Sequence, residues 1–369
     1  MHRPSPTTAV PFRPDIEGLR GVAVLAVVLF HAGLAGVAGG FVGVDVFFVL
    51  SGFLIGGIIL EHRGEDRFYP AFYARRTARI FPAYFLLVAL AYIPLGQYGT
   101  HSGKVPLLGY LSFTSNLYTS MGTAFSFWLR PLWSVSIEEQ FYLLAPIGLR
   151  LLHRRLIPWM LGAVIIGSAG LRTATLLGLV DLRANAWDFT LTRLDGLALG
   201  VLAAWLLGKP AVVRAGRARA RSIGVVFALL LGSCLWLAQQ SEAAQKGPGI
   251  LLLSFTAFVA IALVRLNPAS WLSWFLRLRY LAFLGRHSYF LYLFHMPMLW
   301  LGTILAPTYF FSPVTARIAV NALAMIALCA IAPLSWRWFE APLLALGRRV
   351  VYGRGAGPAG AQPKASVAA

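Results

Sequence analysis

Apolar runs of about twenty residues recur along almost the whole chain, separated by short polar and basic loops. An α-helix needs about 20 mostly apolar residues to cross the hydrocarbon of a bilayer. The runs lie at 20–38, 41–61, 80–96, 133–153, 157–178, 190–207, 222–240, 249–264, 284–305 and 316–335. Only 12% of the 369 residues are charged, which is roughly half of the share in soluble domains. We therefore expect an all-α, polytopic integral membrane protein with about ten transmembrane helices.

The remaining segments predict one membrane domain followed by a tail. The stretch 105–118 is short and interrupted by polar residues, so we expect it to be interfacial or re-entrant. Residues 347–369 are basic and rich in Gly, Ala and Pro, which is typical of disorder. The predicted organisation is a membrane domain over 1–346 and a disordered cytoplasmic tail over 347–369. Both cysteines, Cys234 and Cys329, fall inside apolar runs and indicate no disulfide framework.

The formal net charge of +19 is spread over alternate loops. A nucleic-acid-binding protein would carry such charge on one face of a soluble module, so we expect no nucleic-acid partner. With the N-terminus in the cytoplasm, the outer loops hold little beyond Lys104, Arg130, Arg183 and Lys246. This asymmetry obeys the positive-inside rule and predicts that both termini face the cytoplasm. The inner loops contain Arg63, Arg67, Arg75, Arg76, Arg79, Arg150, Arg154, Arg155, Lys209, Arg214, Arg217, Arg219, Arg221, Arg265, Arg277 and Arg279.

The first apolar run carries two polar residues, Arg20 and His31. Ionisable groups at membrane depth are rare, and each is by default a functional hypothesis. A separation of eleven residues is close to three helical turns, so both lie on one face, roughly 16 Å apart along the axis. If Arg20 marks the cytoplasmic rim, His31 lies near the middle of the membrane. The structural alternative is a histidine ring that bonds a backbone carbonyl.

The second run places Asp45 and Ser51 among glycines. Gly52 and Gly56 form a G-x-x-x-G pair, which is typical of close helix packing. Packing alone does not explain Asp45. Its candidate partners are His31 on the preceding helix and Arg193 on a later one.

Later runs add further polar candidates. Ser136 and Glu139 match an S-x-x-E capping box, which leaves Glu138 as the better catalytic candidate of the two glutamates. Arg193 and Asp195 are either functional or neutralise other buried charges. His295 precedes Pro297 and could bond a carbonyl that the proline frees.

Arginines gather where the third run begins, at Arg75, Arg76 and Arg79. Any cytoplasmic loop collects arginines, so topology alone could explain them. Arg76 and Arg79, three residues apart, also share a helix face, which suits forked donors that converge on phosphate oxygens. Both interpretations remain open.

Several stretches, in this order, resemble the acyltransferase-3 family of bacterial membrane O-acyltransferases over residues 13 to about 343. The stretches are "RPDIEGLRGVAVLAVVLFHAGL", "GGFVGVDVFFVLSGFLI", "RRTARIFPAYF", "LWSVSIEEQFY", "GRHSYFLYLFHMP" and "SWRWFEAPL". The family's motif residues fall here on Arg20 and His31, on Ser51, Gly52 and Phe53, on Arg76 and Arg79, and on Glu138, Phe141 and Tyr142. Some members append an extracytoplasmic hydrolase-like domain, which we do not expect in this chain.

The resemblance implies transfer of an acyl group, usually acetyl, from cytoplasmic acyl-CoA to a hydroxyl of a glycan or other acceptor, in the bacterial cytoplasmic (inner) membrane. We expect the phosphates of the donor to stay against Arg20, Arg76 and Arg79. A neutral imidazole near pH 7 suits deprotonation of a hydroxyl, so His31 is the predicted general base. By the logic of an acid that orients a base, Asp45 or Glu138 would hold its ring.

We assign Ser51, Arg193, Asp195 and His295 as supporting residues. An acyl-enzyme intermediate at His31 or Ser51 remains open, although direct transfer needs fewer assumptions. No metal-ligand spacing such as H-E-x-x-H occurs, so we expect no metal and no cofactor beyond the acyl-CoA substrate.

Two further questions remain open at this point. A proton-coupled transporter or a flippase of lipid-linked glycan precursors would also need buried ionisable residues, although no internal repeat supports it. The expected acceptor is a cell-surface glycan, first O-antigen of lipopolysaccharide, then exopolysaccharide or peptidoglycan, with a glycolipid or a macrolide as alternatives. We expect the acceptor pocket in the outer stretch 97–130, with its "QYGTHSGK" and "TSNLYTS" segments and its aromatic residues.

Overall fold

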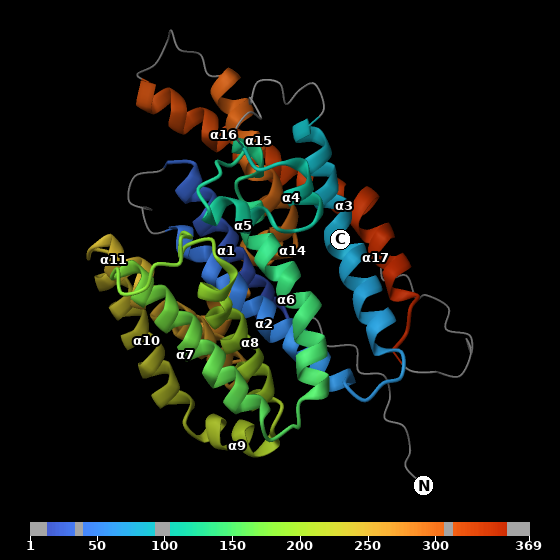
Figure 1. Ribbon diagram of the computed structural model, residues 1–369, viewed down its shortest axis with the longest axis vertical. Helices are drawn as coiled ribbons and strands as arrows, with labels where there is room; N and C mark the ends of the chain where they lie inside the picture. The colour runs from blue at the N-terminus through green and yellow to red at the C-terminus, as the bar shows by residue number, and fades with distance from the viewer. Residues whose placement is uncertain (1–12, 34–39, 93–103, 306–312, 353–369) are drawn as a thin grey trace.

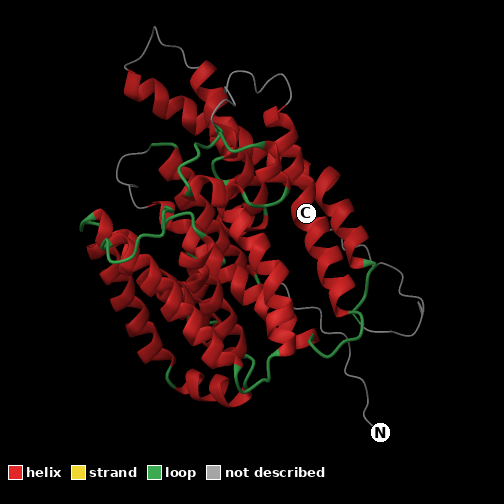
Figure 2. Cartoon of the chain, in the orientation of Figure 1, coloured by secondary structure: helices red, strands yellow, loops and turns green. Residues whose placement is uncertain are grey.

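The computed structural model describes residues 13–33, 40–92, 104–305 and 313–352, and these ranges are almost entirely helical (Figure 2). Within them, pairing of the strand type is limited to one isolated bridge between Lys104 and Ala124. One long helix occurs in the region of each predicted span. These helices are α1 (Pro14–His31), α2 (Gly43–His62), α3 (Phe68–Tyr92), α6 (Leu132–Leu151), α7 (Ile157–Leu176), α8 (Leu194–Leu207), α10 (Ala220–Leu237), α12 (Ile250–Leu266), α15 (Ser288–Leu305) and α16 (Pro313–Ser335).

Short helices connect the long ones. They are α4 (Leu107–Leu111), α5 (Ser115–Ser120), α9 (Pro210–Ala218), α11 (Glu242–Ala244), α13 (Trp271–Leu276), α14 (Arg279–Arg286) and α17 (Ala341–Arg348). Three 3-10 turns, η1 (Gly40–Val42), η3 (Phe127–Leu129) and η4 (Thr190–Thr192), and two π-helical turns, η5 (Gln245–Gly249) and η6 (Trp336–Glu340), complete the described chain.

Five stretches of helix in the described residues are long and apolar enough to cross a membrane, judged by length and composition. A sixth is added if α8 and α9, which meet at an angle of 92°, count as one broken span. Helices α1, α3 and α6 are also long, but they contain charged residues, among them Arg20, Arg76 and Glu138. The expected all-α, polytopic membrane protein is confirmed.

Helices α2 and α8 pack at glycine contacts. An ideal Cβ at Gly52 would lie 2.0 Å from the carbonyl oxygen of Leu197, and one at Gly200 would lie 2.1 Å from that of Val49. At Gly56 the nearest atoms belong to Val201, at 3.0 Å. The two backbones therefore approach more closely than any larger residue allows, as the G-x-x-x-G pattern predicted.

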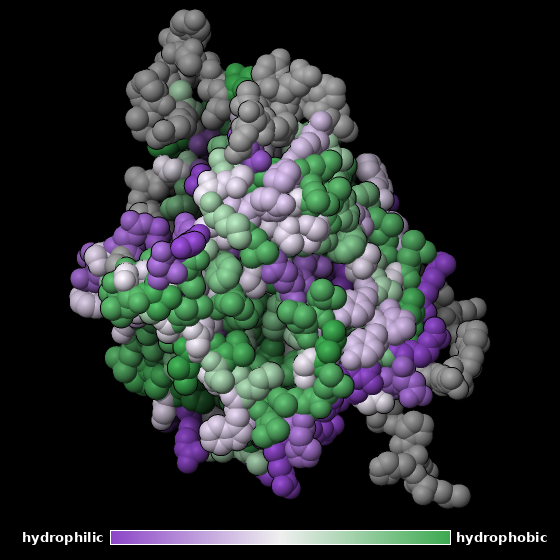
Figure 3. Space-filling view, in the orientation of Figure 1, coloured by the Kyte–Doolittle hydropathy of each residue, from purple (hydrophilic) through white to green (hydrophobic). Residues whose placement is uncertain are grey.

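The loops assigned to the cytoplasm gather at one end of the molecule. Arg63, after α2, donates to the carbonyl oxygens of Arg150 and Leu152, after α6, both at 3.0 Å. Arg150 in turn lies over the ring of Phe68, 5.0 Å from its centroid, at the start of α3. This end is the lower one in Figure 1, where α9 lies, and Figure 3 shows hydrophilic residues protruding there below an apolar belt.

Several predicted boundaries were wrong. α3 begins at Phe68 rather than at 80, so Arg75, Arg76 and Arg79 lie inside a helix and not in a loop. The predicted span 284–305 is interrupted at His287, between α14 and α15. The stretch 105–118, by contrast, was not expected to span, and it forms α4 and most of α5, two helices too short to do so.

The start of the predicted tail, residues 347–352, is also folded. α17 runs to Arg348 and packs against α3, and Tyr352 is buried with its ring 4.1 Å from that of His62. Residues 347–352 therefore belong to the folded domain, whereas 353–369 lie outside the described residues.

Candidate functional site

A cavity of about 1220 Å³ begins at the basic end and extends between α1, α2, α3, α6 and α8. Its inner walls are largely apolar and include Val44, Phe47, Leu54 and Ile58 of α2. Such a space suits a ligand with a highly charged end and a slender, mostly uncharged arm. The cations that line it are Arg13, Arg20, Arg63, Arg76, Arg79, Arg154, Arg155, Lys209, Arg265 and Arg348.

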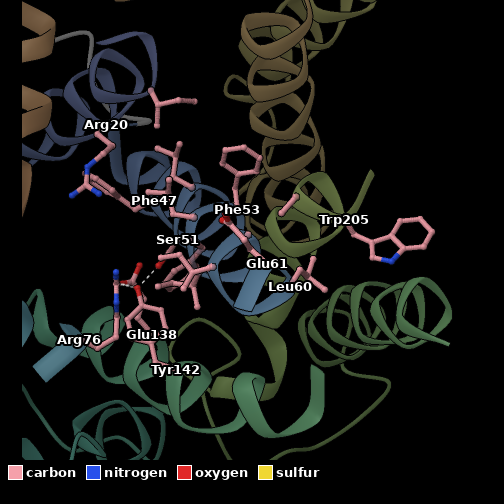
Figure 4. Close-up of a pocket in the computed structure, with 18 of the residues that line it drawn as sticks. Arg20, Phe47, Ser51, Phe53, Leu60, Glu61, Arg76, Glu138, Tyr142 and Trp205 are labelled. Atoms are coloured by element: carbon pink, nitrogen blue, oxygen red, sulfur yellow. Dashed lines mark hydrogen bonds between the residues drawn. The ribbon is translucent and has the colours of Figure 1, made fainter. Parts of the chain in front are cut away.

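A polar cluster lies inside this cavity (Figure 4). The Tyr142 hydroxyl donates to Glu138 Oε2 at 3.2 Å, across one turn of α6, and is hydrogen-bonded to Ser51 Oγ on α2. Arg20 of α1 donates through Nε and Nη2 to Ser288 Oγ, at 3.1 and 2.9 Å. The structure thus brings together motif residues of α1, α2 and α6, and it adds Ser288 of α15, which the motifs had not singled out.

His31 lies at the C-terminal end of α1 and contacts a second histidine, His295 of α15. His31 Nδ1 is 3.0 Å from the carbonyl oxygen of Val27 and 3.2 Å from His295 Nε2. His295 is fully buried, and its Nδ1 is 2.7 Å from the carbonyl oxygen of Tyr292. The two imidazole rings lie 5.0 Å apart.

These contacts define the tautomers of the histidine pair. A carbonyl oxygen only accepts, so Nδ1 of His295 carries its proton and Nε2 presents a lone pair. Nδ1 of His31 then carries a proton that Val27 and His295 share, and the lone pair of His31 is on Nε2. His31 thus does bond a backbone carbonyl, as the structural alternative for this residue held. This bond leaves the ring in the neutral tautomer with a lone pair on Nε2, which a general base requires.

His31 is not among the residues that line the cavity. The cavity reaches Tyr292 and Ser134, whose hydroxyl groups are hydrogen-bonded at 2.6 Å, and the Tyr292 hydroxyl also donates to the carbonyl oxygen of Pro131. His295 follows Tyr292 by one turn of α15, with the two rings 5.9 Å apart. The histidine pair therefore lies next to Tyr292, a residue of the cavity wall.

The expectation that Asp45 or Glu138 orients the ring of His31 was wrong. Asp45 Oδ1 accepts from Arg193 Nη2 at 2.8 Å, in an ion pair that is almost completely buried. Glu138 accepts from Tyr142 in the cavity. The atom that contacts His31 Nδ1 from outside its own helix belongs to His295, which we had assigned only a supporting role.

Arg193 is enclosed by aromatic rings. Its guanidinium carbon lies 4.7 Å from the ring of Trp187, 5.5 Å from that of Trp133 and 5.6 Å from that of Phe48. These faces stabilise a cation whose Nε and Nη1 have no hydrogen-bond partner. Arg193 thus neutralises Asp45 inside a packed core.

Asp195 has a partner that the sequence analysis missed, Arg172 of α7. Arg172 Nη2 donates to Asp195 Oδ2 at 2.7 Å and Nη1 donates to the carbonyl oxygen of Thr192 at 2.6 Å. Arg172 is the one charged residue of its apolar run, so the need to neutralise Asp195 could have pointed to it. The interpretation that Arg193 and Asp195 neutralise other buried charges fits this geometry.

The capping-box interpretation of Ser136 was wrong, because α6 begins at Leu132 and Ser136 lies in its second turn. Ser136 donates to the carbonyl oxygen of Leu132 at 3.1 Å and is hydrogen-bonded to Ser115 of α5 at 2.9 Å. Glu139 is consequently no helix cap, and its Oε1 is buried without a partner.

The outer stretch 97–130 differs from the expected sugar platform. In α5, Asn116 is fully buried and donates to the carbonyl oxygen of Asp188 and to Thr190 Oγ1, at 3.0 and 2.8 Å. The "TSNLYTS" segment therefore uses polar groups to pack against the chain before α8. Most of "QYGTHSGK" lies outside the described residues.

Within the described ranges, no three His, Cys, Asp or Glu side chains come close enough to hold a metal ion. The chemistry available at this site is that of hydroxyl, imidazole, carboxylate and guanidinium groups.

Comparison with known proteins gives the family. A family model described as an acyltransferase domain, that of the acyltransferase-3 family, matches residues 13–337. The chain belongs to this family. The match includes α1 to α16, and therefore both the cavity and the histidine pair.

Several curated proteins are similar to this chain. YrhL of Bacillus subtilis strain 168 is 29% identical over 359 residues, which cover 91% of this chain and 55% of that protein. The peptidoglycan O-acetyltransferase OatA of Listeria monocytogenes is 28% identical over 89% of this chain and 55% of its own length. The O-acetyltransferase OatA of Staphylococcus aureus strain NCTC 8325 is 28% identical over 90% and 57%, respectively. The chain thus spans just over half the length of these relatives. No solved structure matches it.

Proposed function

We propose that this chain is a membrane O-acyltransferase that takes an acyl group, most simply acetyl, from cytoplasmic acyl-CoA and delivers it to a hydroxyl of an envelope glycan. One observation carries the proposal: a cavity with a basic rim extends into the helices and ends one side chain away from a histidine pair. Membership of the acyltransferase-3 family supports the type of reaction.

The donor fits the cavity by charge and shape. Its phosphates cannot enter hydrocarbon, so they remain among the rim arginines, where Arg76 and Arg79 lie on one face of α3. The pantetheine arm then follows α2 inward toward Ser51 and Glu138. Arg20 supplies hydrogen-bond donors and Glu138 supplies acceptors where the arm carries its amide groups.

The reaction occurs at His31 Nε2. As the acceptor hydroxyl attacks the thioester carbonyl, its proton passes to Nε2, a carbon–oxygen bond forms and the carbon–sulfur bond breaks. His31 then returns the proton to the CoA thiolate, so that acyl ester and free CoA are the products. While His31 is protonated, the lone pair of His295 Nε2 accepts from its Nδ1–H, as a carboxylate does in a hydrolase triad.

Direct transfer is simpler than a serine intermediate in this geometry. Ser51 Oγ is hydrogen-bonded to Tyr142 and, through it, linked to Glu138. The hydrogen-bond partner of Ser51 Oγ is thus a tyrosine, not the histidine base that an activated serine nucleophile normally has. We propose no acyl-enzyme at this residue.

A glycan of the cell envelope is the proposed acceptor, with peptidoglycan first because it is named for the Listeria monocytogenes relative. A transporter that relays protons through Asp45 or Asp195 would need these acids free to titrate, and both are held in ion pairs with arginines. The geometry therefore favours the enzyme over the transporter.

The decisive experiment supplies radiolabelled acetyl-CoA to inverted membrane vesicles that contain wild type, His31→Ala or His153→Ala. His153 is an exposed histidine of the cytoplasmic loop after α6, so it is the matched control. We expect alkali-labile label in peptidoglycan with wild type and the control, and none with His31→Ala at equal protein levels.

Other outcomes are equally informative. Label in lipopolysaccharide or in a lipid fraction would replace the proposed acceptor and leave the enzyme in place. Label retained by His31→Ala would remove His31 from the chemistry, and absence of label with wild type would contradict acyl transfer from acetyl-CoA.

A further inference from the structure

The end of the described chain adds a cation to the cavity rim. Residues beyond 337 lie outside the family match, yet α17 lies beside α3 (Figure 1). Gly347 is buried there, and a Cβ at this position would lie 2.7 Å from Ala78 Cβ and 2.9 Å from the carbonyl oxygen of Ala74. The next residue, Arg348, lines the cavity. The close approach at Gly347 thus places Arg348 next to the turn of α3 that carries Arg79.

The residues after Arg348 hold this arrangement in place. Tyr352 lies beside His62. The guanidinium carbon of Arg75 is 4.6 Å from the centre of the Tyr352 ring. Arg75 Nη2 also donates to the carbonyl oxygen of Val350 at 3.3 Å, and the Arg67 amide donates to that of Tyr352 at 3.1 Å. We call residues 347–352 the C-terminal clamp, because they fasten the end of α17 to α3 and to the loop before it.

The cavity is lined by many more arginines than acids, with Glu17, Glu61 and Glu138 as its acidic residues. In the part of the chain that the structure describes, none of Arg76, Arg79 and Arg348 forms an ion pair. Three guanidinium groups on two packed helices repel one another until an anion joins them. Guanidinium forks match phosphate oxygens in geometry as well as in charge.

We propose that Arg348 binds the phosphate groups of the acyl-CoA donor together with Arg76 and Arg79, and that the C-terminal clamp holds it in position. This inference rests on the proposed function, since it takes acyl-CoA as the donor. It extends the donor site beyond the segment that the family model matches. Arg348 serves binding of the phosphate end and has no part in the reaction at His31.

Steady-state kinetics of the full-length chain in nanodiscs test the assignment, with radiolabelled acetyl-CoA as donor and peptidoglycan fragments as acceptor. The variants are Arg348→Gln and Arg349→Gln. Arg349 is adjacent, exposed and absent from the cavity wall, so it controls for the loss of one positive charge. We expect the KM for acetyl-CoA to rise about tenfold in Arg348→Gln with kcat unchanged, and to stay within about twofold of wild type in Arg349→Gln.

A second donor separates contact with phosphate from general damage. Acetyl-pantetheine lacks the nucleotide and its phosphates, so wild type and Arg348→Gln should show equal kcat/KM with it. An unchanged KM for acetyl-CoA in Arg348→Gln, an equal rise in both variants, or a matching loss with acetyl-pantetheine would each overturn the assignment while wild-type transfer keeps the proposed function. Absence of transfer by wild type would overturn both.

Discussion

The histidine pair assigns different tasks to two chemically identical side chains. The carbonyl oxygen of Tyr292 fixes the tautomer of His295, and His295 with Val27 fixes that of His31. A buried neutral imidazole thus occupies the place that a carboxylate takes in many hydrolases. In the proposed mechanism it orients the base without adding a second buried negative charge to a region that already holds Asp45.

Substitution of His295 tests this arrangement. His295→Phe removes the acceptor for His31 Nδ1–H, so we expect kcat to fall by about two orders of magnitude, within the usual contribution of a positioned base. The KM for acetyl-CoA should not change, because His295 does not line the cavity. His295→Gln, whose amide oxygen can accept, should recover part of the lost kcat. A rise in KM with unchanged kcat would contradict the assignment.

The ion pair of Asp45 and Arg193 leads to a second prediction. Asp45→Ala leaves Arg193 buried and uncompensated, which should cost about 3–5 kcal/mol of stability. The double variant Asp45→Leu/Arg193→Met should regain most of that loss, measured as the apparent Tm of detergent-solubilised protein. It should also retain acyl transfer. A folded but inactive double variant would restore the catalytic role that the sequence suggested for Asp45.

At the residue scale, the sequence predicted which polar residues lie in the helices, but it did not predict what these residues contact. Arg20, His31, Ser51 and Glu138 were found because polar groups in apolar runs are conspicuous. Their partners were not, since a neutralising arginine such as Arg172 can come from any helix, and sequence separation does not restrict the choice. The identity of the ring-orienting group depended on how α1 and α15 meet, which no local pattern encodes.

At the scale of helices, the close pairing of α2 and α8 positions the cavity wall. The face of α2 that carries Gly52 and Gly56 contacts α8, while Ser51 and Phe47 of the same helix line the cavity. A change in the packing of these two helices would therefore move the polar cluster.

Alanine at Gly200 should be strongly destabilising, because its Cβ would lie 2.1 Å from the Val49 carbonyl oxygen and 2.5 Å from the Phe53 amide. We expect Gly200→Ala to elute largely as aggregate in size-exclusion chromatography of detergent extracts. Gly57→Ala on α2 is the matched control, since the nearest atom to its Cβ is 3.9 Å away. Equal behaviour of both variants would contradict the packing described here.

The helices themselves were predictable where apolar residues are continuous, and their ends were not. α3 begins twelve residues before its predicted span, at Phe68 rather than at 80, because its first turns are amphipathic and pack at the cytoplasmic surface, where hydropathy gives no signal. The end of α17 and residues up to 352 fell in the predicted disordered tail, which was to begin at 347. The segment from 347 onward has the composition of a flexible tail, and Gly347 at its start packs closely against α3.

At the scale of the whole molecule, the basic loops and the cavity rim lie at the same end. The rim combines residues from distant parts of the sequence, including Arg13, Arg154, Lys209 and Arg348. The positive-inside rule predicted this clustering, because it assigned the loops that carry these residues to one compartment. It could not predict that they would surround a single cavity.

Accessible cysteines test the orientation. In a chain without its native cysteines, Ser51→Cys should react with a membrane-impermeant thiol reagent in inverted vesicles, and CoA should protect it, because Ser51 lines the cavity. Asp181→Cys, exposed between α7 and α8, should react only from the opposite side. Modification of both positions from the same side would contradict the topology.

The hydrogen bond between Tyr292 and Ser134 has a consequence for the host membrane. A protein that passes acyl groups from one compartment to the other must do so without letting protons and ions follow. In the proposed function, the side chain of Tyr292, held at the cavity wall by this hydrogen bond, would interrupt a column of water toward the histidine pair. Cells could therefore carry many copies of this protein and still keep the electrochemical gradient on which their energy supply depends.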